Sequence, residues 1–446
     1  MKIKNILSSK NLIIAAVLLL TQNSKAQSWS SVGAGTNGFV LALTVYNDSL
    51  IVGGDFTTAG GNPANNIAVW NGSSWSALGA GMNNAVHSLT VFNGNLYAGG
   101  DFTTAGGNPA SEIAEWNGSS WTALGAGMKG LYSPPFFTGG VYALAGYNGN
   151  LYAGGEFDTA GGNPVNFIAK WNGTIWSSLD TGLPNYNEVY ALTVYNGNLF
   201  VGGWVYSGVA EWNGTTWSTP GSGIDGIAYA LTVFNGNLYA GGQIYQGGYP
   251  INVEEWNGTS WSALGAGINE YHGVDALIAY NGNLYAGGEF DSAGRNPASN
   301  IAVWNGTSWS ALGTGVNAPD SAFAVYNGCL YTGGEFTIAD GTSANYIASK
   351  CGTAAIDEVS NIDNNELPYP NPTSSLIHLT YNLPEGINMG KLVITNISGQ
   401  IVKTYNIDNA LNYIVVDTKQ YAAGEYIYNI YSSGNYISTS SKFIVK

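Results

Sequence analysis

Short apolar runs alternate with turn residues along most of the chain. In residues 86–121 (VHSLTVFNGNLYAGGDFTTAGGNPASEIAEWNGSSW), two runs of strand character flank Asn93-Gly94, and a second hairpin turns at Asn117-Gly118. Asn-Gly tolerates the positive φ angles of a tight hairpin turn. The stretch shows no helical periodicity. We therefore predict four short antiparallel strands for this unit.

The unit recurs seven times. Each copy has a Gly-Gly pair after an apolar run, and the steps between copies range from 242 − 203 = 39 to 155 − 100 = 55 residues. Such a period is typical of propellers and solenoids, and four strands in each copy favour the propeller. The fold class predicted is therefore all-β, with a seven-bladed β-propeller built of four-stranded blades.

The last copy is split between the two ends of the array. Six copies contain a Trp-Asn-Gly-x-x-Trp turn, but the seventh ends at residues 347–352 (IASKCG) without its second Trp strand. The missing piece, SWSSVGAG, stands at residues 28–35. We expect this N-terminal strand to complete the last blade and close the ring, which removes open sheet edges.

The order of apolar run, Gly-Gly, spaced aromatics and Trp strand resembles the kelch-type propeller repeat. The segments GGDFTTAGG and WNGSSW are similar to a family of bacterial secreted propellers without settled function. The resemblance covers residues 28–352. It implies the fold and names no activity.

Residues 1–26 have the pattern of a signal peptide. Lys2, Lys4 and Lys10 precede the apolar run 12–20 (LIIAAVLLL), and Ser24-Lys25-Ala26 offers small residues for cleavage before Gln27. The alternative is a membrane anchor, for which the apolar run is short. After cleavage we expect no membrane span.

The composition changes after the repeats. Residues 353–366 are polar and acidic and indicate a linker, and residues 367–446 alternate as in a small antiparallel β-sandwich. This last segment resembles the type A sorting domain of the type IX secretion system, on the motifs YPNP (369–372), NISGQ (396–400), AGEY (423–426) and KFIVK (442–446). The resemblance implies recognition by the type IX secretion machinery, removal of the domain, and release or attachment at the outer cell surface of a Gram-negative bacterium. The alternative is an ordinary adhesive sandwich.

The overall charge argues against some partners. The formal net charge is −15 and only 9% of residues are charged. Such a chain lacks the basic surface of a nucleic-acid binder, so we expect no nucleic-acid partner. The two cysteines, Cys329 and Cys351, replace turn asparagines on neighbouring antiparallel strands of the seventh copy. We predict a disulfide between them, which the oxidising export route permits.

No catalytic residue is assigned. The propeller contains two histidines, His87 and His272, and lacks the G-x-S-x-G and H-E-x-x-H motifs. An acid follows Gly-Gly in five copies: Asp55, Asp101, Glu156, Glu289 and Glu335. These acids could bind a hard cation such as Ca²⁺ or serve glycoside chemistry. We favour a structural role, in which each accepts hydrogen bonds from backbone amides of the TTAGG loop, and expect no required cofactor.

Function should lie where the copies differ. One position near the start of the first strand varies from copy to copy: Leu41, His87, Tyr142, Tyr190, Tyr229, Asp275 and Ser321. These would surround the channel mouth, with Tyr132, Phe136, Tyr186, Tyr206 and Tyr271 on nearby loops. Aromatic faces beside hydrogen-bonding groups suit sugars and peptides. The ligand-binding candidates are therefore His87, Tyr142, Tyr190, Tyr229, Asp275, Tyr132, Phe136, Tyr186 and Tyr271. Alternatively, the tyrosines only pack the loops.

These observations favour a secreted binding or adhesion module for a glycan or an extracellular protein. One alternative is a polysaccharide-active hydrolase or lyase that uses carboxylates and tyrosines at the mouth. Another is a passive structural component of the cell surface.

Overall fold

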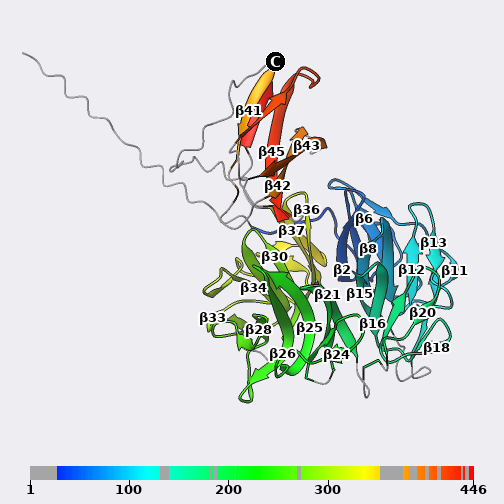
Figure 1. Cartoon of the computed structure of the whole chain (residues 1–446). Helices are drawn as coiled ribbons and strands as arrows, with labels where there is room; N and C mark the ends of the chain where they lie inside the picture. Colours follow the sequence, from blue (N-terminus) through cyan, green and yellow to red (C-terminus); the bar gives the residue numbers. More distant parts are fainter. Residues whose placement is uncertain are drawn as a thin grey trace, which may run out of the picture. The chain divides into compact units, whose positions relative to one another are not determined.

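The computed structural model describes residues 28–130, 140–180, 182–183, 188–205, 207–268, 273–351, 375–381, 383, 389–396, 401–408, 413–432, 435–436 and 441–446. The chain divides into two compact units, Met1–Thr353 and Ala354–Lys446. Each unit is described by itself. The described secondary structure is all-β, and the first unit is a series of antiparallel sheets consistent with propeller blades (Figure 1).

Seven sheets follow one another in the described part of the first unit, and we number them 1 to 7 in chain order. Sheet 1 contains β2 (Phe39–Tyr46), β3 (Ser49–Asp55), β6 (Ile67–Trp70) and β7 (Trp75–Ala77), and sheet 2 contains β8 (Val86–Phe92), β9 (Asn95–Gly100), β12 (Ile113–Trp116) and β13 (Trp121–Ala123). Sheet 3 contains β15 (Val141–Tyr147), β16 (Asn150–Gly155), β19 (Ile168–Trp171) and β20 (Trp176–Ser177), and sheet 4 contains β21 (Val189–Tyr195), β22 (Asn198–Gly203), β23 (Val209–Trp212) and β24 (Trp217–Ser218). Sheet 5 contains β25 (Asp225–Phe234), β26 (Asn237–Gln246), β28 (Val253–Trp256) and β29 (Trp261–Ala263), with β27 (Tyr249–Pro250) beside β26, and sheet 6 contains β30 (Gly273–Tyr280), β31 (Asn283–Glu289), β34 (Ile301–Trp304) and β35 (Trp309–Ala311).

Sheet 7 takes its fourth strand from the other end of the array. It contains β36 (Asp320–Tyr326), β37 (Cys329–Gly334), β40 (Ile347–Cys351) and β1 (Ser30–Ser31), in the order β1-β40-β37-β36. The register pairs Ser30 with Ser349. The N-terminal strand thus occupies the place of the missing Trp strand, as the split repeat predicts.

Small two-residue strands lie in the connections between the second and third long strands. They are β4 (Thr58–Ala59) with β5 (Asn62–Pro63), β10 (Thr104–Ala105) with β11 (Asn108–Pro109), β17 (Thr159–Ala160) with β18 (Asn163–Pro164), β32 (Ser292–Ala293) with β33 (Asn296–Pro297), and β38 (Ile338–Ala339) with β39 (Thr342–Ser343). β14 (Met128–Lys129), in the connection from sheet 2 to sheet 3, pairs with β17.

The Gly-Gly pairs let the backbone approach its neighbours closely. A Cβ on Gly100 would lie 2.0 Å from the carbonyl oxygen of Ala85, and a Cβ on Gly99 would lie 2.4 Å from Val141 Cγ1 of the next sheet. Both positions therefore require glycine. The same approach recurs between the ends of the array, where a Cβ on Gly333 of sheet 7 would lie 2.3 Å from Val40 Cγ1 of sheet 1.

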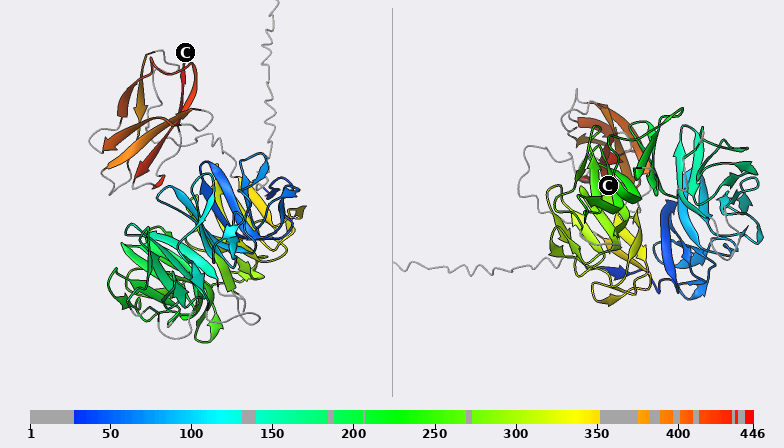
Figure 2. Two further views of the ribbon diagram at one scale, coloured as in Figure 1. Left: turned by 90° about the vertical axis from the view of Figure 1, so that its right-hand side faces the viewer. Right: turned by 90° about the horizontal axis from the view of Figure 1, so that it is seen from below.

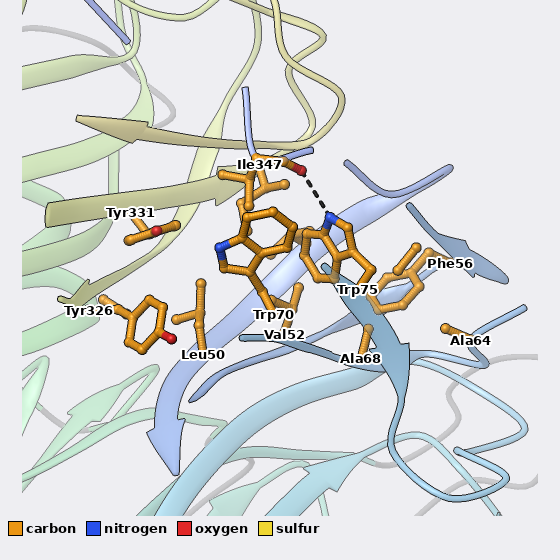
Figure 3. Close-up of a cluster of buried hydrophobic side chains, with 14 of the residues drawn as sticks. Leu50, Val52, Phe56, Ala64, Ala68, Trp70, Trp75, Tyr326, Tyr331 and Ile347 are labelled. Carbon is orange, nitrogen blue, oxygen red and sulfur yellow. Dashed lines mark hydrogen bonds between the residues drawn. The ribbon is translucent and has the colours of Figure 1, made fainter. Parts of the chain in front are cut away.

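Hydrophobic cores fill the spaces between neighbouring sheets. One cluster joins Tyr97 and Ile113 of sheet 2 to Leu151 of sheet 3. Sheets 7 and 1 share an equivalent cluster, in which Tyr331 and Ile347 pack with residues of sheet 1 (Figure 3). The strands of these two sheets lie side by side, yellow beside blue, in Figure 2.

Six Trp pairs link each sheet to the chain before it. Trp116 and Trp121 lie with their ring centroids 5.4 Å apart, and Trp121 Nε1 donates to the carbonyl oxygen of Leu78, 3.0 Å away. Trp75 Nε1 donates in the same way to the carbonyl oxygen of Val32, just after β1, at 2.9 Å (Figure 3). The Trp residues are thus packing elements between sheets.

Sheet 7 has its own version of this packing. Lys350 stands where the other copies have the first Trp, and its Nζ lies 5.8 Å from the centroid of the Trp29 ring. The carboxylate of Asp340 accepts from Trp29 N at 3.0 Å and lies 3.8 Å from Lys350 Nζ. Cys329 and Cys351 are register partners on β37 and β40 and form a disulfide.

The second unit contains two antiparallel sheets. β41 (Leu376–Thr380) pairs with β44 (Tyr413–Asp417), and the other sheet contains β43 (Ile401–Asp408), β42 (Met389–Asn396), β45 (Gly424–Ser432), β46 (Asn435–Tyr436) and β47 (Ser441–Val445). Both sheets contribute to one core, for example Ile377 from β41 and Leu392 from β42. The hydroxyl of Tyr428 donates to the carbonyl oxygen of Thr380, 2.9 Å away, and so links the two sheets.

Candidate ligand-binding site

The variable position of each first strand is a β-bulge. In sheet 2 the register shifts between Val86 and Ser88, so that His87 is the extra residue. All seven sheets have the same shift, and all seven bulged residues are partly exposed between two buried neighbours. Bulges redirect side chains and commonly lie beside functional sites. The bulged residues are Leu41, His87, Tyr142, Tyr190, Tyr229, Asp275 and Ser321.

A second residue accompanies each bulge fourteen positions later, just after Gly-Gly. His87 Nε2 and Asp101 Oδ2 lie 2.8 Å apart, and the hydroxyl of Tyr142 donates to Glu156 Oε2 at 3.5 Å. The same sequence spacing gives the pairs Leu41/Asp55, Tyr190/Trp204, Tyr229/Gln243, Asp275/Glu289 and Ser321/Glu335. In sheets 2 and 3 the acids thus belong to the same site as the bulged residues.

This arrangement corrects the role expected for the acids. The backbone amides of the TTAGG loop donate to an asparagine from the preceding connection. Asn83 Oδ1 accepts from Thr103 N at 2.9 Å and from Thr104 N at 2.8 Å. Asn37 and Asn317 make the equivalent bonds. In the loops that follow Asp55, Asp101 and Glu335, these amides are therefore satisfied by an asparagine and do not need the acid.

Four bulged residues form a continuous aromatic row across sheets 2 to 5. The ring centroids of His87 and Tyr142 lie 5.3 Å apart, and those of Tyr142 and Tyr190 lie 5.7 Å apart in a stacked arrangement with an interplanar angle of 17°. Tyr190 and Tyr229 meet edge to face at 5.2 Å. Such contacts hold the rings in fixed relative positions. Sequence predicted these four residues, and the structure places each against the next.

Carboxylates surround the aromatic row. Burial raises the pKa of the Tyr142 hydroxyl, and Asp101, Glu156 and Glu188 raise it further. Burial and a hydrogen bond to Glu188 raise the pKa of Tyr190. Asp101 Oδ1 is buried without a hydrogen-bond partner among the described residues. The tyrosines therefore remain protonated hydrogen-bond donors at neutral pH.

Glu112 is an acid that sequence reasoning missed. It occupies the left-handed position held by Asn66 in sheet 1, with φ of 63° against 61° for Asn66. Asn66 there accepts from Phe56 N and donates to the carbonyl oxygen of Met82. Burial raises the pKa of Glu112 to about 8, with further contributions from Asp101 and Glu156. The sequence offered little signal for Glu112, because this position is Asn in three copies and Phe167, Ser207 or Tyr346 in three others.

A second acidic group lies in sheets 6 and 7. Burial raises the pKa of Asp275 to about 7, and Glu289 and Glu335 raise it further. Asp320 is fully buried where the other six copies have Val or Ala, and burial raises its pKa well above the ordinary range. The bulged positions are therefore aromatic in sheets 2 to 5 and acidic in sheet 6.

Several expected site residues remain outside this account. Tyr132, Phe136, Tyr186 and Tyr271 lie outside the described residues. Within the described ranges, no three His, Cys, Asp or Glu side chains gather as metal ligands. That finding gives no support to a Ca²⁺ site at the acids Asp55, Asp101, Glu156, Glu289 and Glu335.

No helix in the described part of the chain has the length and apolarity to span a membrane.

Residues 368–446 match the family model of the secretion system C-terminal sorting domain. The chain ends in a type IX secretion sorting domain. It is therefore directed to the outer cell surface or the exterior of a Gram-negative bacterium, and the type IX machinery recognises this domain. A comparison with curated proteins gave no match.

Two of the solved structures that are similar to the chain are computationally designed proteins. The computationally designed Ika8 protein is 14% identical, with a TM-score of 0.45 over 73% of this chain and 100% of that one. The computationally designed Ika4 protein is 17% identical, with a TM-score of 0.26 over 40% of this chain and 92% of that one.

Proposed function

We propose that sheets 1 to 7 are the blades of a closed, kelch-like β-propeller. Three observations support closure: β1 pairs with β40, sheets 7 and 1 share a core, and Gly333 meets Val40 as Gly99 meets Val141. We further propose a cleaved leader at residues 1–26, a propeller at 27–352, a linker at 353–366 and a removable sorting domain at 367–446. Mass spectrometry of the N-terminal peptide of the secreted protein tests the first boundary, and Gln27, as glutamine or pyroglutamate, is the expected first residue.

We propose that the propeller is a binding module for an extracellular glycan. The aromatic row of His87, Tyr142, Tyr190 and Tyr229 carries this proposal. Its rings are partly exposed, held against one another, and bordered by carboxylates that accept hydrogen bonds. Sugar rings stack on aromatic faces, and their hydroxyls donate to carboxylates.

A glycan-array screen of the secreted protein, with and without Ca²⁺, tests this proposal. We expect binding to at least one glycan, and loss of that binding in Tyr190→Ala and Tyr229→Ala. The matched control is Val194→Ala, because Val194 lies on the same strand as Tyr190, is 39% exposed, and is a repeated residue that recurs as Val45, Val91, Val233 and Val325. Failure to bind any glycan would reject the proposal in favour of a protein partner or a passive surface role.

A second candidate function is polysaccharide cleavage. It is favoured by Glu112, whose pKa is about 8, beside Asp101 and Glu156. A carboxyl that remains protonated at neutral pH can act as a general acid, while an ionised neighbour acts as the base. Incubation of any bound glycan with the wild type and Glu112→Gln tests this candidate. Turnover that the variant lacks would support it, and an intact glycan after prolonged incubation would reject it.

A further inference from the structure

We infer that the site around Glu188, Tyr190 and Trp204 binds a glycan carrying free, protonated amino groups. This inference rests on the proposed glycan-binding function and names the class of sugar. It starts from sheet 4, whose residues depart most from the repeat.

Trp204 provides an exposed aromatic side chain on the sheet that carries Tyr190. It stands where five other sheets have an acid, fourteen positions after Tyr190, and it is 61% exposed. Its backbone N donates to the carbonyl oxygen of Glu188 at 2.9 Å, so the two residues are neighbours across the sheet. An indole this exposed contributes little to the core. A flat aromatic surface of this size suits the apolar face of a pyranose ring.

Sheet 4 has no acid fourteen residues after its bulged residue. Glu188, two residues before Tyr190, provides a carboxylate instead. The hydroxyl of Tyr190 donates to Glu188 Oε2, and Tyr190 stacks on Tyr142, which has Glu156 as its partner. The site therefore combines one exposed indole, two phenol rings and two carboxylates.

The negative charge of the carboxylates around these rings favours a positively charged ligand. The groups that raise the pKa values of Tyr142, Tyr190 and Tyr229 are carboxylates and neighbouring tyrosines, and His87, which lies against Tyr142, is already paired with Asp101. Aromatic faces bordered by carboxylates attract cations through the ring quadrupole as well as through charge. An acidic glycan would be repelled, whereas an ammonium group on a sugar satisfies both the rings and the carboxylates.

Titration calorimetry with the secreted protein tests the inference. The probes are an oligomer of glucosamine, the matching oligomer of N-acetylglucosamine, which has the same rings without the charge, and oligolysine, which has the charge without the rings. We expect the glucosamine oligomer to bind at least about tenfold more tightly than either control. We expect Trp204→Ala and Glu188→Gln each to weaken it by about tenfold, while Val194→Ala leaves it unchanged.

The other outcomes separate this inference from the proposed function. Equal binding of the two oligosaccharides would overturn the preference for a cation and leave glycan binding standing. Preference for oligolysine would overturn the assignment to a sugar. Binding of the glucosamine oligomer that survives both Trp204→Ala and Glu188→Gln would overturn the location of the site.

Discussion

The Trp pairs are the same from sheet to sheet, whereas the bulged residues vary in side chain. The six Trp pairs have nearly constant geometry, with ring centroids 5.0 Å apart in Trp212/Trp217 and 5.6 Å apart in Trp304/Trp309. Each second Trp donates to a backbone carbonyl of the preceding connection. The bulged residues share one backbone feature, yet their side chains range from leucine to tyrosine and aspartate.

This contrast separates scaffold from function within each repeat. The Trp pairs solve the same packing problem at each junction between sheets, so the same residues serve each time. The bulge is a repeated backbone feature that carries tyrosine in sheets 3 to 5 and leucine, histidine, aspartate or serine in the others. A residue that departs from the repeat without improving packing, such as Trp204 or Glu112, is therefore a functional candidate.

The largest effect should follow from removing a repeated Trp. Trp121 is 3% exposed and donates to the carbonyl oxygen of Leu78. Trp121→Ala should lower the free energy of unfolding by about 3–5 kcal/mol, because it leaves a cavity and an unpaired carbonyl. Denaturant unfolding measures this, with the exposed Trp204→Ala as the matched control, for which we expect almost no loss. An equal loss of unfolding free energy in Trp121→Ala and Trp204→Ala would contradict the distinction between a structural Trp and an exposed, functional one.

The disulfide should come next in size. It links β37 to β40, the strand on which β1 pairs. The double variant Cys329→Ser/Cys351→Ser should lose about 3 kcal/mol, because the unfolded chain gains conformational freedom. Thermal unfolding of wild type and variant, each with and without reductant, checks this. Reductant should lower the wild-type midpoint and leave the variant unchanged, and an unaffected wild type would contradict the prediction.

Glu112→Asn should have a smaller, pH-dependent effect. The folded-state pKa of Glu112 is raised from 4.5 to about 8, so the unfolded chain releases this proton first as the pH rises. The contribution of Glu112 to stability is therefore fully present below pH 4.5 and is lost as the pH rises to about 8. Asn, which fits this position in sheet 1, should remove that loss and stabilise the protein above pH 8 by about 1–3 kcal/mol.

Denaturant unfolding across this pH range measures the difference between wild type and Glu112→Asn. The gain from the substitution should grow with pH and then level off. A gain that is constant with pH would show that the charge of Glu112 is not responsible.

Much of the fold and part of the site could be predicted from the sequence. Asn-Gly turns and Gly-Gly pairs predicted the strands, and the split repeat predicted that β1 pairs with β40. The four aromatic bulged residues were also predicted as neighbours. The role of Asp101 and Glu156 was not, because the sequence shows neither the bulge nor the register that brings a residue beside its fourteenth successor. Glu188 and Trp204 were missed because the acid of sheet 4 stands two residues before the bulge and not fourteen residues after it.

The central claim is that the bulged residues bind ligand and the repeated residues hold the fold. The glycan-array signal of the double variant Tyr142→Ala/Tyr190→Ala, compared with that of wild type at equal concentrations of folded protein, tests it most directly. We predict that binding is lost while the unfolding midpoint falls by no more than about 2–4 °C. Glycan binding at the wild-type level in this variant would contradict the claim.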